Sequence, residues 1–460
     1  NQSYFSVNCN PIYGCIDTLA LNFDSIADTD DGSCNYIMTY VPDDNFESYL
    51  ENAGLGDGIL NDSVITAYIQ TVNYLSIGQQ NIANLTGIED FILLDYLHAW
   101  GNQIDSLDLS ANTALEKLNI WSNQLTYLDI SNNTALNQLQ CHDNQLTSLD
   151  VSNNPNLSYF ICYYNDLTSI DISNNTLLST LSVGANLINS LDVSTNTALT
   201  SLSCSSNPIT SLDVSSNINL TALSFFNTSI SSVNINNNIA LTYLDCRGNQ
   251  LTNLDVSQNT ALVDLKCSYN QLISLDVSQN TDLTQLNCGN NNLTNLNVST
   301  NITLTQLHCY ENLLTSLSVG NNTNLTNFNC YSNQLTSLDV SQNTALTFLD
   351  CSYNQLTNLD VRNGNAANFI HLGATTNPNL YCIDVDDVAW SALNWTYIDA
   401  ASSFSTDCDF EIIGCTVNTA CNYDSTATIN DGSCLTAYGC TDATACNYDV
   451  SATCDDGSCF

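Results

Sequence analysis

The chain has 460 residues, of which 46 are Asp or Glu and only 4 are Lys or Arg, so its formal net charge is −42. So few cations exclude a phosphate-neutralising surface, and we expect neither nucleic acid nor an anionic membrane as a partner. Hydrophobic residues make up 43% of the chain, an ordinary share for a globular protein, so the acidity does not indicate disorder. No apolar run approaches the roughly 18 residues of a membrane span, which excludes insertion into a membrane.

Three short segments share one pattern: residues 14–36 near the N-terminus, and residues 414–438 and 439–460 at the C-terminus. Each begins with Gly-Cys, continues with Ala-x-Asn, an aromatic residue and Asp, and ends with Asp-Gly-Ser-Cys. The equal spacing of the outer cysteines predicts the disulfides Cys15–Cys34, Cys415–Cys434 and Cys440–Cys459. Segments of about 20 residues are too small for a hydrophobic core and need cross-links or a metal ion.

The acidic turn of each module offers several hard oxygen ligands, and it resembles the short calcium loops of secreted proteins. We therefore expect calcium as a cofactor. The alternative is an Asp-Gly turn whose carboxylates are solvated. The candidate ligands are Asp24, Asp30, Asp31, Asp424, Asn430, Asp431, Asp449, Asp455 and Asp456.

The third module carries two inner cysteines, Cys446 and Cys454, where the first module has Leu21 and Thr29. Because both cysteines are gained or lost together, we expect a Cys446–Cys454 disulfide inside that module.

Cys9 and Cys421 then have no partner within a module, and a bond between them in neighbouring molecules is one alternative. Cys9 precedes Cys15 by the spacing that separates Cys434 from Cys440. Residues 1–13 therefore read as the end of a preceding module and a linker, and the chain as a segment of a longer string of modules.

Residues 37–81 read as an N-terminal cap. A short amphipathic helix is predicted to begin behind the acidic cap Asp43-Asp44, followed by a glycine-rich loop.

Residues 82–376 are organised by a 21-residue repeat. Thirteen Leu or Ile residues recur at a constant step of 21 from Ile104 to Leu356, and an Asn stands two residues before each of them except at Thr228. A second Asn column runs from Asn112 to Asn343. Alternating inward residues predict a short parallel strand in each coil, with a second extended segment on the opposite face. Inward Asn side chains can satisfy backbone groups of adjacent coils. The expected fold is mainly β: a solenoid of about 13 coils with little helix.

The half-repeat LxxLxCxxNxL, as in Leu346 to Leu356, resembles the leucine-rich-repeat family with internalin-like 21-residue repeats. The N-terminal cap and residues 377–413, read as a C-terminal cap, are similar to those of secreted leucine-rich-repeat proteins of the Bacteroidota. For the C-terminal cap, we expect a disulfide between Cys382 and Cys408 that closes the exposed end of the rod.

Nine cysteines lie on the repeat lattice, in the inward column that Ile120, Val183 and Phe225 occupy in other coils. We expect them to be small buried hydrophobic residues with inert thiols. They are Cys141, Cys162, Cys204, Cys246, Cys267, Cys288, Cys309, Cys330 and Cys351.

An outward column on the predicted strand face is rich in aromatic residues, which suit stacking on sugars or contact with a protein. The alternative is that large side chains merely cover the sheet. The proposed binding surface consists of Trp100, Trp121, His142, Tyr163, Tyr310 and Tyr331.

The opposite face carries a column of Asp residues at one position of the repeat. In most coils a Ser stands two residues after this position. We expect each carboxylate to accept a hydrogen bond from the backbone that follows it, and the alternative is binding of cations or of an ordered surface. The column comprises Asp108, Asp129, Asp150, Asp171, Asp192, Asp213, Asp255, Asp276, Asp339 and Asp360, with Asn234, Asn297 and Ser318 in the gaps.

Four Asp-Ser/Thr-hydrophobic triplets resemble the O-glycosylation motif of the Bacteroidota, with acceptors at Thr18, Ser25, Ser63 and Ser106. The sequence contains no zinc-protease motif, phosphate loop or nucleophile elbow, so we expect no enzymatic activity.

The predicted function is a non-catalytic adhesion or binding solenoid, extracellular or at the cell surface, with a protein or glycan ligand on the aromatic face. One alternative is a segment of an extracellular filament in which copies of the chain join end to end. A weaker one is the non-catalytic part of a glycan-processing enzyme.

Overall fold

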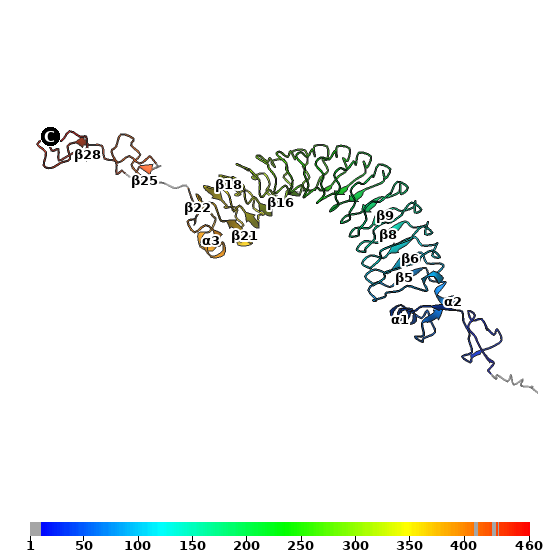
Figure 1. Cartoon of the computed structure of the whole chain (residues 1–460). Coiled ribbons are helices and arrows are strands. Elements are labelled where there is room, and N and C mark those ends of the chain that lie inside the picture. The colour runs from blue at the N-terminus through cyan, green and yellow to red at the C-terminus, as the bar shows by residue number, and fades with distance from the viewer. Residues whose placement is uncertain (1–10, 409–412, 426–428, 431) are drawn as a thin grey trace, which may run out of the picture.

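The computed structural model of the chain describes residues 11–408, 413–425, 429–430 and 432–460. Its dominant feature is an arch of stacked coils whose inner side is lined by one parallel sheet (Figure 1). This sheet has 16 strands, each two to four residues long. They are β5 (Tyr74–Ser76), β6 (Tyr96–His98), β7 (Lys117–Asn119), β8 (Gln138–Gln140), β9 (Tyr159–Ile161), β10 (Thr180–Ser182), β11 (Ser201–Ser203), β12 (Ala222–Ser224), β13 (Tyr243–Asp245), β14 (Asp264–Lys266), β15 (Gln285–Asn287), β16 (Gln306–His308), β17 (Asn327–Asn329), β19 (Phe348–Asp350), β21 (His371–Ala374) and β23 (Tyr397–Ile398).

The strands keep the register that the 21-residue step predicts. Leu181 of β10, for example, stands opposite Leu202 of β11, and both side chains are buried. Because side chains alternate along a strand, the residues on either side of that central Leu face outward. Thirteen of the strands belong to the strict repeat, and β5, β21 and β23 extend the sheet into the caps. The expected fold class, a mainly β leucine-rich-repeat solenoid, is confirmed.

The opposite face of the coils is only partly a sheet. Four strands pair there in parallel, all near the C-terminal end: β18 (Ser337–Asp339), β20 (Asn358–Asp360), β22 (Cys382–Asp384) and β24 (Ser403–Ser405). In the earlier coils, all of which the structure describes, the corresponding segments are not paired as strands. The arch explains this difference, because its outer side is longer than its inner side. Figure 1 shows that neighbouring segments lie farther apart on the outer side of the arch than on the inner side.

Both Asn columns form the hydrogen-bonded ladders that the sequence predicts. In the first, Asn123 accepts at Oδ1 from the Ile104 N–H at 3.1 Å and donates from Nδ2 to the carbonyls of Ala99 and Ile120. In the second, Asn133 donates to the carbonyls of Leu109 and Asn112. These bonds tie each coil to the preceding one and satisfy backbone groups that are buried at the turns.

The N-terminal cap closes the first coil. Helix α1 (Asp44–Asn52) begins at the N-cap Asp43, whose carboxylate accepts from the backbone N–H groups of Asn45 and Phe46. Strands β3 (Met38–Tyr40) and β4 (Ser63–Ile65) pair antiparallel, and the short α2 (Thr66–Ile69) follows them.

The C-terminal cap contains α3 (Val388–Asn394), against which the buried Trp395 packs. The disulfide Cys382–Cys408 closes this end of the rod. Two short 3-10 turns, η1 (Ile88–Asp90) and η2 (Ala366–Asn368), complete the small helical content.

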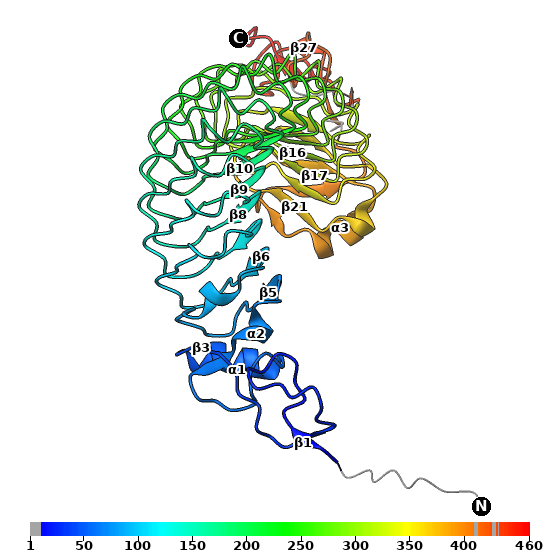
Figure 2. The same ribbon diagram turned by 90° about the vertical axis from the view of Figure 1, so that its right-hand side faces the viewer.

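Each end module is a loop closed by a two-stranded parallel ladder and one disulfide. The ladders join β1 (Tyr13–Gly14) to β2 (Thr29–Asp30), β25 (Ile413–Gly414) to β26 (Ile429–Asn430), and β27 (Tyr438–Gly439) to β28 (Cys454–Asp455). The disulfides are those that the outer spacing pairs, Cys15–Cys34, Cys415–Cys434 and Cys440–Cys459. The first module also contacts the cap, since Asp17 accepts from the hydroxyls of Tyr36 and Tyr68. Figure 2 shows this module, around β1, at the cap end of the rod near α1.

The expected Cys446–Cys454 disulfide is wrong, and so is the assignment of Cys421 as unpaired. Cys454 bonds to Cys421 of the preceding module, with their Cα atoms 5.9 Å apart, and Cys446 is an exposed free thiol. The physical reason lies in the linker between the modules. The Leu435 carbonyl accepts from the Cys421 N–H, and it lies 3.0 Å from Sγ of Cys454. The linker thus brings together two cysteines of different modules, and the spacing of cysteines inside one module cannot predict such a bond. Cys9 lies outside the described residues.

Candidate binding surface on the concave face

The proposed N-terminal binding residues lie together on the long sheet and form a continuous stack of rings. We define the aromatic ladder as Tyr74, Tyr96, His98, Trp100, Trp121, His142 and Tyr163. The ring centroids are 4.5 Å apart for Trp100 and Trp121, 5.1 Å for Trp121 and His142, and 4.3 Å for His142 and Tyr163. The planes of these pairs lie within 28° of parallel. Stacking arises because the same outward position recurs in each coil at the spacing of the strands.

The column of rings that runs through Trp121 begins at Trp100, because the preceding coil has a glycine, Gly78, at this position. A methyl group at Gly78, the residue of the preceding coil in this column, would collide with the indole of Trp100. Trp100 therefore lies over a backbone that has no side chain. Gly184 follows Tyr163 in the same column, so the next coil contributes no ring to the stack.

The two central rings of the stack, Trp121 and His142, expose their edges rather than their faces. Each of Trp121 and His142 is covered on both faces by its neighbours, and both rings are at least partly buried. A hollow of about 360 Å³ lies at this end of the ladder, lined by Trp121, His142, Asp143, Tyr163 and Tyr164. The ladder thus offers an amphipathic edge with an adjoining concavity.

Burial favours the neutral form of both histidines of the ladder. Burial lowers the pKa of His142 to about 4, although the charge of Asp143 opposes that shift, and burial also lowers the pKa of His98. Nδ1 of His142 is buried and has no hydrogen-bond partner among the described residues.

A second aromatic group lies on the other limb of the arch. Tyr310 and Tyr331 stack at 5.5 Å, and the ring of His371 contacts both Phe348 and Tyr397. Residues of this group and their neighbours line a hollow of about 340 Å³. The sequence analysis named Tyr310 and Tyr331 but missed Tyr74, His371 and Tyr397, since these three belong to strands outside the strict repeat.

Two of the three cations on the concave face are paired with acidic side chains. Arg247 pairs with Asp245 at 2.7 Å and lies over the Phe226 ring, and Lys266 pairs with Asp264 at 2.9 Å. Lys117 lies 5.8 Å from the centroid of the Tyr96 ring. An anionic ligand therefore finds little uncompensated positive charge on this face.

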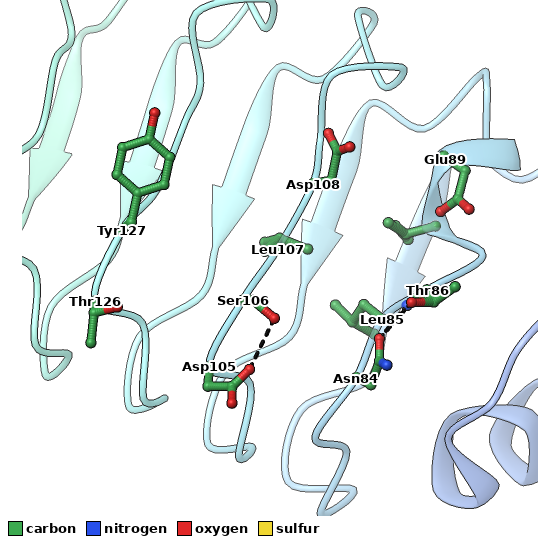
Figure 3. A pocket seen from close by; sticks show the side chains of 11 residues that line it. Asn84, Leu85, Thr86, Glu89, Asp105, Ser106, Leu107, Asp108, Thr126 and Tyr127 are labelled. Carbon is green, nitrogen blue, oxygen red and sulfur yellow. Dashed lines mark hydrogen bonds between the residues drawn. The ribbon is translucent and has the colours of Figure 1, made fainter.

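A larger hollow lies on another face of the coils. It has about 560 Å³, and Figure 3 shows its side chains on loop segments in front of the strands. Short polar side chains dominate it, and some bond to each other, as Ser106 does to Asp105. We favour the aromatic ladder, because aromatic anchors contribute most of the binding energy at interfaces. The lining residues are Asn84, Leu85, Thr86, Ile88, Glu89, Asp105, Ser106, Leu107, Asp108, Thr126 and Tyr127.

The Asp column behaves as the first of its two interpretations expects. Asp192 accepts from the Ser194 N–H at 2.9 Å, and the same bond recurs at most other members of the column. Hydrogen bonds from the Ser194 hydroxyl and N–H lower the pKa of Asp192. The carboxylates are thus each stabilised by their own coil.

The acidic turns of the modules use their carboxylates locally. Asp30 accepts from Gly32, Asp31 from Ser33, and Asp449 from Ser451. Within the described residues, no group of three or more His, Cys, Asp and Glu side chains is arranged to hold a metal ion. Asp431 and the side chain of Asn430 lie outside the described part. Calcium binding remains a prediction.

The nine lattice cysteines are all buried and unbonded. Burial raises the pKa of the Cys141, Cys204 and Cys288 thiols to about 12, so thiolate chemistry is suppressed. Of the glycosylation candidates, Thr18, Ser25 and Ser106 are exposed and Ser63 is half-buried. Their modification remains a prediction.

These features define a class: a leucine-rich-repeat solenoid with two asparagine ladders, a buried cysteine column and capped ends. The chain matches no protein-family model, and no curated protein sequence matches it. Its structure is similar to the functional domain of InlJ from Listeria monocytogenes, whose description names a cysteine ladder. The identity is 37% and the TM-score 0.70, over 77% of this chain and 78% of that domain.

The internalin InlF from the same species is 24% identical with a TM-score of 0.57, over 76% of this chain and 96% of that one. A leucine-rich-repeat protein of Leptospira interrogans shares the fold at 20% identity and a TM-score of 0.58, over 74% and 97% of the two chains. The chain belongs to the internalin-like leucine-rich-repeat proteins. Among the described residues, no helix is long and apolar enough to cross a membrane.

Proposed function

We propose that the chain is a non-catalytic, extracellular binding solenoid that holds a protein ligand against the aromatic ladder. The five disulfides and the kinship with internalins support a location outside the cell. The resemblance of both caps to those of secreted Bacteroidota proteins supports the same location.

The single observation that carries the proposal is the stack from Trp100 to Tyr163. Sugars bind aromatic side chains by lying against a free ring face, but here the faces of Trp121 and His142 are covered by other rings. Ring edges carry partial positive charge, and indole adds an N–H donor. Such edges suit backbone carbonyls and apolar side chains, so a protein fits this surface better than a glycan.

The net charge of the chain indicates which kind of protein ligand this surface favours. The chain carries −42, and two of its three concave cations, Arg247 and Lys266, are paired with acidic side chains, so a neutral or basic ligand surface is favoured over an acidic one. The hollow beside His142 and Tyr163 would receive an anchoring side chain.

The test uses two probes, a phage-displayed random peptide library and an array of neutral oligosaccharides. The wild-type chain should enrich peptides and not bind the array. Trp121→Ala removes the centre of the stack and should weaken the enriched peptides at least about tenfold, as loss of an aromatic anchor does. The matched control is Tyr127→Ala, because Tyr127 is 65% exposed but belongs to the opposite face.

Equal loss of affinity in both variants would contradict a site on the ladder. Binding to the array that depends on Trp121 would replace the protein ligand with a glycan.

A structural role in a filament is the second candidate function. The disulfide between consecutive modules, Cys421–Cys454, favours it because it joins modules rather than closing one. The same variant separates the two functions, since a filament seen by electron microscopy should assemble normally with Trp121→Ala.

A further inference from the structure

One exposed thiol has a structurally equivalent residue that is already bonded. Among the described cysteines, Cys446 is the exposed free one, whereas the nine other free cysteines are buried in the rod. In the module pattern, Cys446 stands where the second module has Cys421 and the first has Leu21.

The backbone around these three residues has the same conformation. The N–H of Leu21 donates to the carbonyl of Asn35 at 2.8 Å, that of Cys421 to Leu435 at 3.1 Å, and that of Cys446 to Phe460 at 2.8 Å. In each module the accepting residue directly follows the closing cysteine. Phe460 therefore lies against the third module as Leu435 lies against the second.

Leu435 begins the linker that positions the partner of Cys421. Three residues further on, Tyr438 pairs with Cys454 in the ladder of β27 and β28. The carbonyl of Leu435 lies 3.6 Å from Sγ of Cys421 and 3.0 Å from Sγ of Cys454. A linker on this path places the inner cysteine of one module beside the ladder of the next.

The residue types follow the order of the modules. Cys421 lies in a module that another module follows, whereas Leu21 lies in a module followed by the cap of the rod. The receiving residue is Cys454 in the third module, which follows a module, but Ile429 in the module that follows the rod and Thr29 in the first module. A cysteine thus occupies the Cys421 position in a module that is directly followed by another module.

We propose that Cys446 is the attachment point for a further module of the same type, placed in tandem behind the third and carrying a cysteine at the position of Cys454. The two thiols form one disulfide and lose two protons and two electrons. A small-molecule or protein disulfide accepts the electrons by thiol–disulfide exchange and is reduced to two thiols. This inference is independent of the ligand on the concave face.

The test extends the chain after Phe460 with a second copy of residues 436–459, so that Phe460 takes the place of Leu435. In the copy, the counterpart of Cys446 is replaced by leucine, as at Leu21, which makes the Cys446 peptide unique. A matched extension also replaces the counterpart of Cys454 by isoleucine, as at Ile429. All three proteins are refolded with oxidised and reduced glutathione, labelled with maleimide in the native state, and mapped by mass spectrometry.

Cys446 should be labelled in the unextended chain and in the isoleucine extension. In the cysteine extension it should be unlabelled and found in a disulfide with the copy, from which reductant releases it. Labelling of Cys446 in the cysteine extension would overturn the proposal, as would equal protection in the isoleucine extension. A disulfide-linked dimer of the unextended chain through Cys446 would also overturn it. Absence of the copy's own outer disulfide would count against tandem folding itself.

Discussion

Cysteine has opposite roles in the rod and in the end modules. Cys267 in the rod is fully buried, and its thiol takes the place that Val183 takes in another coil. In the modules, Cys15 and Cys440 are buried only because disulfides hold them there. The contrast shows that one region is stabilised by repetition and the other by cross-links.

The difference follows from how much apolar surface each region can bury. In the rod, every coil packs its Leu and Val residues against two neighbours, and the core continues without a break into both caps. In the first module, Leu21 is 66% exposed and Ile26 is 69% exposed, so this module has almost no core. A segment of that size depends on its covalent bond.

Reduction should therefore have the largest effect, and only at the ends. With dithiothreitol, the modules at 414–438 and 439–460 should lose their structure, because each is closed by a single internal disulfide and joined to the other by one more. The rod should keep its β circular dichroism and its melting transition. Limited proteolysis followed by mass spectrometry would locate the cleavages. A rod that melts with the modules would contradict the comparison.

The rod should instead be sensitive to its ladders. Asn270→Ala removes the acceptor of the Leu251 N–H and the donor to the carbonyls of Cys246 and Cys267. Leaving a buried N–H unpaired and losing these bonds should lower the free energy of unfolding by about 2–4 kcal/mol. Urea denaturation would measure it. Asn253→Ala, at an exposed position of the preceding coil, is the matched control and should change little.

The same prediction can be tested in the opposite direction by adding an asparagine where the first ladder lacks one. Thr228 interrupts the first ladder, and its hydroxyl donates to the Phe225 carbonyl at 3.2 Å. Thr228→Asn would supply an acceptor for the Ile209 N–H, as Asn249 does for Ile230 one coil later. It should raise the stability of the rod, and a loss of stability would show that this coil has adapted to threonine.

The repeat made the rod predictable from sequence. Because each coil repeats the last, a residue's place in the 21-residue unit determines whether it lies inward, outward or in a ladder. The inward cysteines, Asn123 and Trp121 could all be placed in this way. Curvature could not, since it depends on side-chain volumes summed over both faces. The missing strands on the outer face of most coils follow from that curvature.

The modules were predictable only within each copy. The outer disulfides follow from spacing, but the bond from Cys421 to Cys454 depends on the path of the linker at Leu435, which no count within a module describes. The ring stack was likewise foreseen as a column, but its covered faces were not, because stacking depends on the rotamers of neighbouring coils. The sequence left a protein and a glycan ligand open, and the covered faces of Trp121 and His142 are the reason that we propose a protein.

The smallest effect is expected on the outer face, at the Asp column. Asn234 and Asn297 occupy gaps in the column and accept the same backbone hydrogen bond, from Asn236 at 3.1 Å and from Ser299 at 3.0 Å. A neutral amide therefore closes the turn as a carboxylate does. Asp192→Asn should lower the urea midpoint at neutral pH only slightly.

Measurements at acid pH should distinguish the stability that the charge of Asp192 contributes from the stability of the hydrogen-bonded turn itself. Because hydrogen bonds lower the folded pKa of Asp192, its stabilising effect is present above the unfolded pKa and is lost as the pH falls through the folded value. The Asp192→Asn variant lacks this contribution and should lose slightly less stability than wild type below pH 4. The charge of the column is thus dispensable for the turn, and calcium titration of the wild type against a variant with several Asp→Asn changes would test cation binding there. Identical heats in both proteins would remove cation binding as a reason for the column, and would leave its charge acting only through solubility and repulsion.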